Sequence, residues 1–446
     1  MPEAVIVATA RSPIGRAFKG SLRDLRADDL TTTIVRAALD RVPELDPAGV
    51  DDLMLGCGMP GGEQGNNLGR VVAIQLGYDH LPGTTVTRYC ASSLQTSRMA
   101  MHAIRSGEGE VFISAGVEMV SRYVKGTSDS LPDTRNPLFA QAQQRTEEHA
   151  QAGAPPWHDP REDGQLPDVY MAMGQTAENV AQQRNVTRRE MDEFAANSQH
   201  RYEKAAANGF WARDITPITL PDGTVIDHDD SPRPGTTAQA LAGLAPAFRP
   251  DGRVTAGNAC PLNDGAAAVI IMSDTRAAEL GLVPLARIVA TGVSALSPEI
   301  MGLGPVEATR KALRRARMRI DDIDLVEINE AFAAQVIPLL PGAGHRPGPA
   351  QRQRRRDRPG PPVRHDRRPD RLDADQQPAV ARQAGRPGDH VRRRRHGHGH
   401  DPGAPQLATV PQNNESVAFR EHRTSPCSRR TTRLVASATA RTMESR

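Results

Sequence analysis

The stretch Asp324-Leu-Val-Glu-Ile-Asn-Glu-Ala-Phe-Ala-Ala-Gln335 joins a short apolar segment to a polar turn and then to small, helix-forming residues. It predicts a strand over residues 325–328 and a helix that runs through Phe332, with Asn329 between them at the carboxyl end of the strand. Polar side chains at that edge of an α/β sheet are well placed for chemistry. Asparagine is also a frequent helix N-cap, so the stretch alone leaves Asn329 either role.

The same alternation of strands and amphipathic helices fills the chain before this stretch. Strands are predicted at residues 5–8, 53–55, 84–89, 111–116 and 286–291, and helices at residues 30–39 and 91–105. Two features repeat. Ala286-Arg-Ile-Val-Ala-Thr291 is similar to Val5-Ile-Val-Ala-Thr9, and an aspartate pair precedes a strand at residues 51–52 and again at 321–322. We therefore predict an α/β fold built from two similar halves.

An insertion separates the two predicted halves, and a tail of different composition follows them. Residues 1–119 are the N-terminal half, and residues 120–250 are a loop domain around helices near 169–183 and 188–207. Residues 251–338 are a C-terminal half that is incomplete. Residues 339–446 show no helical or strand periodicity and consist largely of Arg, Pro, Gly, Asp and His, which predicts a disordered tail.

The net charge of +3 combines two segments of opposite sign. Residues 339–446 hold 23 arginines, no lysine and 10 acidic residues, whereas residues 1–338 hold 33 basic and 43 acidic residues. Arginine runs bind phosphates, so the tail could be a nucleic-acid arm. The lack of lysine and the scarcity of aromatic residues for stacking count against that role, and no nucleic-acid partner is predicted.

Four cysteines, at positions 57, 90, 260 and 427, show neither pairing nor metal-ligand spacing. This usage predicts a reduced, cytoplasmic protein without a metal site. The N-terminus has no basic region before an apolar segment, so no signal peptide is predicted. No segment is long and apolar enough to predict a membrane span.

Cys90 is the strongest candidate nucleophile, because it stands where a predicted strand ends and a helix begins. The free N–H groups and the positive dipole end of that helix favour a thiolate over a thiol. The alternative is a small, buried, apolar cysteine. Cys57 is expected to pack against a turn. Cys260 lies among small residues that would allow either the passage of a slender ligand or tight packing.

Six motifs, in order along the chain, resemble those of the thiolases, the acyltransferases that act on acyl-coenzyme A. They span residues 1–338, about three quarters of the chain, and are Ala8-Thr-Ala-Arg-Ser-Pro-Ile-Gly15, Cys90-Ala-Ser-Ser93, Ala115-Gly-Val-Glu-Met119, Met173-Gly-Gln-Thr-Ala-Glu178, Thr255 to Ala268, and Asn329-Glu-Ala-Phe332. The resemblance implies a thiolase fold of duplicated α/β halves with an inserted loop domain. It also implies a homodimer or homotetramer, with coenzyme A and acyl-CoA as substrates and no permanently bound cofactor.

The resemblance also assigns roles to individual residues. It makes Cys90 the acylated nucleophile and Asn329 the residue that holds a water in an oxyanion hole. Arg233 matches a position near the nucleotide end of coenzyme A. The pantetheine arm is expected to pass Met173, Ala256, Cys260, Leu262 and Phe332. This chain departs from many relatives at position 260, which is often serine, and at Ala172, where some have histidine.

Thiolase chemistry also needs a second base and a histidine that assists at the thioester oxygen. The family supplies them from a Cys-x-Gly-Gly-Gly motif and a Gly-His-Pro motif beyond Asn-Glu-Ala-Phe. Neither motif occurs in this chain, because Gly344-His345 is followed by Arg346.

Both missing motifs are compatible with the genetic code if the gene is read in the frame that begins one nucleotide later. In that frame the codons of residues 352–358 permit V-N-G-G-A-I-A, and those of residues 359–368 permit L-G-H-P-F-G-M-T-G. Residues 391–401 permit C-G-G-G-G-M-G-M-A-M-I. Our hypothesis is a frameshift close to Pro338, with residues after about Leu407 translated from beyond the original stop codon.

The sequence thus predicts a thiolase that cleaves a 3-oxoacyl-CoA with coenzyme A through an acyl-cysteine, as in fatty acid β-oxidation, with impaired activity in this chain. One alternative is the reverse condensation of two acetyl-CoA into acetoacetyl-CoA. Another is a non-catalytic acyl-CoA-binding remnant. A ketoacyl synthase also places cysteine at a strand–helix junction, but the Asn-Glu-Ala-Phe stretch disfavours that family.

Overall fold

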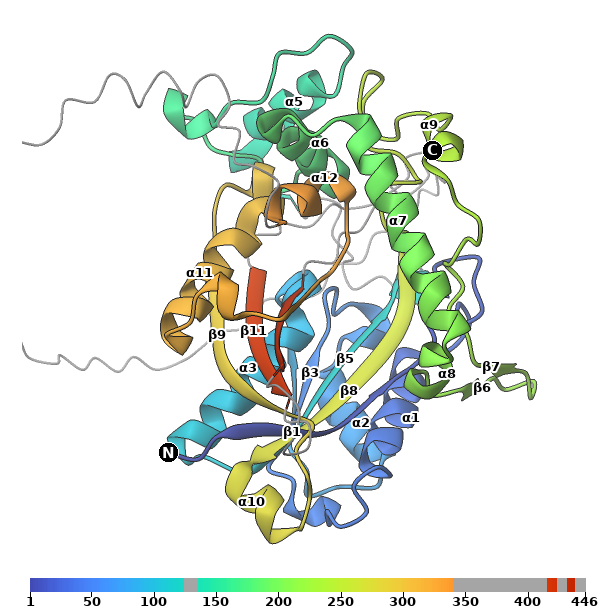
Figure 1. Ribbon diagram of the computed structural model, residues 1–446, viewed down its shortest axis with the longest axis vertical. Helices are drawn as coiled ribbons and strands as arrows, with labels where there is room; N and C mark the ends of the chain where they lie inside the picture. The colour runs from blue at the N-terminus through green and yellow to red at the C-terminus, as the bar shows by residue number, and fades with distance from the viewer. Residues whose placement is uncertain (124–134, 341–414, 423–430, 438–446) are drawn as a thin grey trace, which may run out of the picture. The chain divides into compact units, whose positions relative to one another are not determined.

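The computed structural model describes residues 1–123, 135–340, 415–422 and 431–437. Over these residues the predicted α/β architecture is confirmed, because one long mixed sheet carries helices on its faces (Figure 1). The strand order along the sheet is β10-β12-β11-β9-β1-β8-β5-β3-β4, and β2 (Gly15–Arg16) pairs with β8. A separate ribbon is formed by β6 (Ile218–Thr219) and β7 (Val225–Ile226).

Five strands make the sheet of the first half. They are β1 (Ala4–Arg11), β3 (Asp52–Gly56), β4 (Gly83–Val86), β5 (Val111–Met119) and β8 (Asn263–Ser273). β3 runs parallel to β4 and β5, whereas β8 runs antiparallel to β5 and β1. The domain boundary expected at residue 250 therefore separates β8 from the strands with which it pairs. By strand pairing, the first half extends to Ser273.

Alternating side chains along the strands explain how helices cover both faces of this sheet. Val5 and Val7 pack into the cluster that includes α1 (Ala27–Leu39) and α2 (Leu68–Gln75). Ala4 and Ile6 pack into the cluster that includes α3 (Ser92–Ser106). Successive side chains of a strand point to opposite faces, so α3 lies across the sheet from α1 and α2 (Figure 1).

The described part of the loop domain contains six α-helices joined by long loops, and the short helix that follows Phe332 packs against it. Its helices are α4 (Val120–Tyr123), α5 (Ala140–His149), α6 (Met173–Arg184), α7 (Arg188–Ala207), α8 (Phe210–Asp214) and α9 (Ala238–Ala242). A capping box between Thr187 and Glu190 fixes the start of α7. α12 (Ala333–Val336) contacts both α6 and α7 (Figure 1).

Among the described residues, fewer are buried in the second half than in the first. After α10 (Asp274–Glu279), it consists of β9 (Ala286–Ser294), α11 (Gly304–Ala316) and β10 (Leu325–Ile328). Ala290, Ala308, Ala312 and Leu313 form the small buried cluster between β9 and α11. β10 is exposed, with Leu325 46% and Val326 48% accessible to solvent.

Two strands of the sheet come from the region after residue 338. β11 (Glu415–His422) pairs antiparallel with β9, and β12 (Thr431–Ser437) pairs antiparallel with β11 and parallel with β10. The expectation of no strand after residue 338 is wrong for these two segments. Their sequences, Glu-Ser-Val-Ala-Phe-Arg-Glu-His and Thr-Thr-Arg-Leu-Val-Ala-Ser, contain β-branched and aromatic residues that favour strands. Apart from residues 339–340, the rest of the predicted disordered tail lies outside the described residues.

Candidate active site

Cys90 lies at the junction that the sequence predicts. β4 ends at Val86, a 3-10 turn covers Tyr89–Ala91, and α3 begins at Ser92. The half-buried Cys90 therefore precedes the free N–H groups of the fifteen-residue helix α3. The hydroxyl of Ser92 accepts from Arg88 N at 2.8 Å and donates to Tyr89 O at 2.5 Å, which fixes the turn around the cysteine.

The residue before Cys90 has a strained backbone. Tyr89 adopts φ +46°, in the left-handed region that bulky residues rarely occupy. Such strain persists only where the surrounding structure imposes it, and it often occurs at functional sites. Here the Ser92 hydroxyl bonds to the backbone on both sides of Tyr89, at Arg88 N and Tyr89 O.

Two glycines allow the start of α3 to approach the sheet closely. A Cβ atom on Gly56, at the end of β3, would lie 2.5 Å from the carbonyl carbon of Ser92. A Cβ atom on Gly116 in β5 would lie 2.0 Å from the Oγ of Ser93. The distance of Cys90 from the sheet therefore depends on the absence of side chains at these two positions of β3 and β5.

Glu118 is a polar residue near this junction to which the sequence assigned no role. One of its carboxylate oxygens accepts from Gly58 N at 2.8 Å, and the other lies 3.9 Å from the sulfur of Cys57. Cys57 follows β3 directly and is fully buried. The sequence predicts that this cysteine packs against a turn. The available signal was an acidic residue within the otherwise apolar motif Ala115-Gly-Val-Glu-Met119.

Asn329 follows β10 directly and is half-buried. It is not the N-cap of the next helix, because α12 begins only at Ala333 and its N-cap residue is Phe332. The capping alternative for Asn329 is therefore wrong, and so is the expectation that the helix runs through Phe332. The physical reason is that residues 331–333 use their backbone groups to pair with another segment.

That segment is residues 258–260 of the loop domain's connection to β8. Ala259 and Phe332 form an antiparallel bridge. Cys260 N donates to Ala331 O at 2.9 Å, and Ala333 N donates to Asn258 O at 3.0 Å. The Asn-Glu-Ala-Phe stretch is thus held by backbone hydrogen bonds to the Thr255–Ala268 motif.

Three of the residues predicted to line the pantetheine path come together here. Met173 and Phe332 belong to one buried cluster, and Cys260 packs against it. The Phe332 ring also meets the Phe248 ring edge-on, with 6.2 Å between centroids. Met173, Cys260 and Phe332 therefore form one apolar cluster beside the strand end that carries Asn329.

The other predicted contacts lie outside this cluster. Arg233 is exposed; its backbone N–H donates to Gln199 at 2.9 Å, and its carbonyl accepts from the Thr236 hydroxyl at 2.6 Å. Ala256 is exposed. Leu262 is half-buried, and its carbonyl accepts from Ala17 N at 2.9 Å.

Glu330 attaches the same strand end to α7. Its carboxylate accepts from Arg201 at 2.9 Å and from the hydroxyl of Ser198. Together with the backbone pairing of residues 331–333, this contact fixes the stretch on both sides of Ala331.

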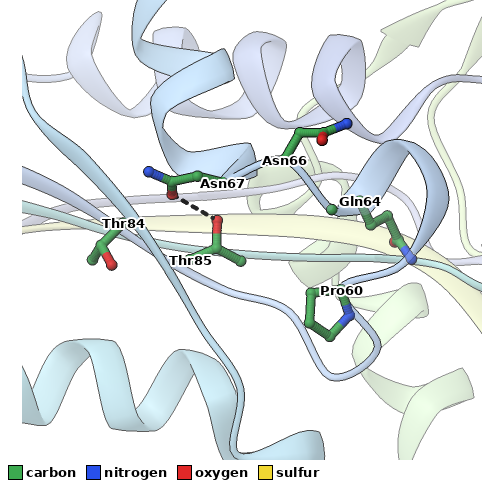
Figure 2. Close-up of a pocket in the computed structure, with 7 residues that line it drawn as sticks. Pro60, Gln64, Asn66, Asn67, Thr84 and Thr85 are labelled. Atoms are coloured by element: carbon green, nitrogen blue, oxygen red, sulfur yellow. Dashed lines mark hydrogen bonds between the residues drawn. The ribbon is translucent and has the colours of Figure 1, made fainter. Parts of the chain in front are cut away.

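A separate polar pocket of about 340 Å³ lies at β4. Figure 2 shows Asn67 and Thr85 turned toward each other in it, joined by a hydrogen bond of 3.2 Å. None of the predicted site residues lines this pocket, whose lining residues are Pro60, Gln64, Gly65, Asn66, Asn67, Thr84 and Thr85.

Two kinds of feature are absent from the residues that the structure describes. No group of three or more His, Cys, Asp or Glu side chains there could hold a metal ion. No described helix has the length and hydropathy needed to cross a membrane.

Comparisons with known proteins agree along most of the chain. The family model described as "Thiolase, N-terminal domain" matches residues 4–275, and the one described as "Thiolase, C-terminal domain" matches residues 282–344. The chain is 41% identical over 360 residues to the 3-oxoadipyl-CoA/3-oxo-5,6-dehydrosuberyl-CoA thiolase of Escherichia coli, covering 76% of this chain and 83% of that protein. It is 37% identical over 353 residues to the 3-ketoacyl-CoA thiolase of Bacillus subtilis, covering 76% of this chain and 83% of that protein.

Two crystal structures resemble the fold. The acetyl-CoA acetyltransferase of Bacillus anthracis superimposes with a TM-score of 0.63 at 36% identity, covering 76% of this chain and 82% of that one. The dimeric peroxisomal thiolase of Saccharomyces cerevisiae superimposes with a TM-score of 0.65 at 31% identity, covering 75% and 80%.

Proposed function

The chain belongs to the thiolase family of acyltransferases, and from this premise we propose that it derives from an enzyme that cleaves 3-oxoacyl-CoA with coenzyme A. The observation that carries the proposal is the pairing of the Asn-Glu-Ala-Phe stretch with residues 258–260, in a fold that also sets Cys90 at the start of α3. Coenzyme A and its thioesters are substrates of this chemistry, and no permanently bound cofactor takes part.

In the proposed reaction the sulfur of Cys90 attacks the 3-oxo carbon of the substrate. The bond between carbons 2 and 3 breaks, and the departing carbanion takes a proton to become acetyl-CoA. The sulfur of a second coenzyme A, having lost its proton, then takes the acyl group from Cys90. The start of α3 supports this assignment, because helix N-termini stabilise a thiolate. Asn329 would hold the water that donates to the developing oxyanion.

We further propose that this polypeptide turns over poorly. Each half-reaction needs a proton transfer, and the chain lacks both motifs that supply the base and the histidine. The exposure of Leu325 and Val326 supports the same proposal, since parallel strands of α/β sheets are normally buried on both faces. A frameshift near Pro338 would explain both the missing motifs and the exposed strand.

Sequencing the gene across the codons of Ile337 and Pro338 tests the frameshift. A slip at these codons, by comparison with an independent isolate of the gene, is the expected result. A gene whose upstream frame is intact would contradict the hypothesis. Expression of the frame-restored gene beside this chain then tests the function, because thiolysis should appear in the restored protein and be negligible here.

The substrate panel should follow the chemistry of the relatives. Acetoacetyl-CoA, longer 3-oxoacyl-CoA esters and 3-oxoadipyl-CoA would be assayed by loss of the 3-oxo thioester in the presence of coenzyme A. Fatty acid β-oxidation is the proposed context. Net synthesis of acetoacetyl-CoA from acetyl-CoA would favour the condensation alternative instead. Binding of acyl-CoA without turnover by the restored protein would favour a non-catalytic binder.

We propose a cytoplasmic homodimer or homotetramer. The yeast neighbour is dimeric, and β4 stands at the end of the strand order with the polar pocket of Figure 2 beside it. Terminal strands offer backbone groups for pairing with another chain. Sedimentation over a range of concentrations should give at least twice the chain mass, and a strictly monomeric protein would contradict this proposal.

A further inference from the structure

Glu178 is a buried carboxylate around which a backbone loop is folded. It lies on α6 and is almost fully buried. Its Oε1 accepts from Arg253 N and Val254 N, both at 2.8 Å, and its Oε2 accepts from Arg253 N at 3.0 Å. A Cβ atom on Gly252 would lie 2.4 Å from Oε1. A buried carboxylate is costly unless it is hydrogen-bonded, so the loop and this side chain are fitted to each other.

Asn258 ties the same loop to a second helix. Its Oδ1 accepts from Thr255 N at 2.8 Å, and its Nδ2 donates to Asp192 on α7 at 2.9 Å. Asp192 is itself buried and held by Arg188 at 2.7 Å. The loop over residues 253–258 is therefore attached to α6 through Glu178 and to α7 through Asp192.

This loop in turn holds the stretch that carries Asn329. Asn258 O accepts from Ala333 N, and Cys260 N donates to Ala331 O. We propose that Glu178 and Asn258 are positioning residues that set the location of Asn329 through the pairing of residues 258–260 with 331–333. The inference rests on the proposed function for the role of Asn329, whereas the positioning itself is independent of turnover.

The first test measures the positioning directly in the full chain. Glu178→Ala removes both acceptor oxygens, Glu178→Gln keeps one, and Glu193→Gln on exposed α7 surface is the matched control. Loss of hydrogen bonds to a buried charged acceptor should speed amide exchange of Cys260 and Ala333 by about tenfold or more. Exchange should be fastest in Glu178→Ala and intermediate in Glu178→Gln. In the Glu193→Gln control it should equal that of the parent chain. Alkylation of Cys260, followed by peptide mass spectrometry, should rise in the same order.

The second test separates positioning from general loosening of the fold. Transfer of the acetyl group from acetyl-CoA to Cys90 is compared with alkylation of Cys90 by iodoacetamide. In Glu178→Ala, acetyl transfer should fall by about tenfold or more while alkylation stays the same, and Glu178→Gln should restore part of the transfer. A Cys90 alkylation rate that changes in Glu178→Ala, in either direction, would show that the substitution disturbs the nucleophile's own surroundings and would overturn the proposal.

The two tests also distinguish failure of this proposal from failure of the proposed function. If the parent chain acquires no acetyl group on Cys90, and neither does its frame-restored form, the proposed function fails. The amide exchange rates and the alkylation of Cys260 would still test whether Glu178 positions residues 258–260 and 331–333. Exchange at Cys260 and Ala333 that is the same in Glu178→Ala and the parent chain would overturn it.

Discussion

Ala259 and Phe332 pair as an isolated antiparallel bridge, which joins the segment before β8 to the segment that follows β10. The ring of Phe332 is fully buried there and meets Phe248 edge-on. Asn329 lies three residues before Phe332, so the packing of this ring, with the backbone pairing of residues 331–333, helps to hold the strand end.

Phe332→Ala should be strongly destabilising. Removing a buried phenyl ring loses its burial energy and leaves a cavity, which costs about 3–5 kcal/mol in the free energy of unfolding. Urea denaturation measures this change. Leu138→Ala, at a position 65% exposed, is the control and should change stability by less than about 0.5 kcal/mol. A similar loss in both variants would contradict the assigned role of Phe332.

Cys90 should be the cysteine that accepts an acetyl group from acetyl-CoA. Peptide mass spectrometry after incubation should find acetylation at Cys90 and none at the fully buried Cys57. Cys90→Ala should remove the label from that peptide without changing the unfolding midpoint by more than a small amount. Equal acetylation of Cys90 and Cys260 would indicate that acetyl-CoA reacts with any accessible cysteine and that Cys90 does not form an acyl-accepting site.

Gly56→Ala should move Cys90. The added Cβ atom would lie 2.5 Å from the backbone of Ser92, so the start of α3 must shift, at a cost of about 1–3 kcal/mol. Slower acetylation of Cys90 is the expected functional result. Gly49→Ala meets nothing within 4 Å and should leave both quantities unchanged. An unaltered Gly56→Ala protein would show that the approach of α3 to β3 is not tight.

Asp264→Asn should change how stability depends on pH. Burial raises the pKa of Asp264 above its ordinary value of 3.8, although hydrogen bonds from the Ser121 hydroxyl and backbone oppose the rise. A raised carboxyl pKa means that the folded state binds the proton more tightly. The stability that this tighter binding contributes is fully present below the pKa that Asp264 has in the unfolded chain. It is lost as pH rises through the pKa that Asp264 has in the folded protein.

The parent protein should therefore gain stability relative to Asp264→Asn as pH falls from neutral into the carboxyl range. Urea midpoints of the two proteins at matched pH values measure the gap. If the midpoint of the parent minus that of Asp264→Asn stays constant or falls on acidification, Asp264 does not titrate as described.

Leu325→Thr combined with Val326→Thr should increase the soluble yield of this chain. Both side chains are about half-exposed on β10, and exposed apolar strands promote association between chains. Threonine retains strand propensity, so the unfolding midpoint should change little. The soluble fraction after expression is the measurement, and Leu53→Thr at a fully buried position should instead lower it. An unchanged yield would indicate that β10 is covered in solution.

Local patterns in the sequence located most elements of the first half, the long helix of the loop domain and the strand that precedes Asn329 in the second half. The helix predicted at residues 188–207 and the strand predicted at 325–328 have those bounds in the structure. The capping box between Thr187 and Glu190 accounts for the start of α7, because it acts within the segment itself.

The errors arose where pairing partners decided the outcome. β8 lies after the loop domain in sequence but pairs with β1 and β5, and no local pattern distinguishes one sheet from another. The helix at Phe332 begins later than predicted because residues 331–333 bond to residues 258–260. Glu178 and Glu118 stand inside motifs that the sequence singled out, yet their roles depend on backbone N–H groups far along the chain.

The sequence by itself determined the family, the acyl-carrying cysteine that we propose, and the absence of the histidine and second cysteine motifs. These follow from residue identity and order, which a linear chain specifies completely. Only the tertiary structure decided that Asn329 is not a helix cap, that Met173, Cys260 and Phe332 pack in one cluster, and that a buried carboxylate on α6 accepts hydrogen bonds from the loop beside them. Those outcomes depend on burial and on hydrogen bonds between distant segments, which exist only once the chain has folded.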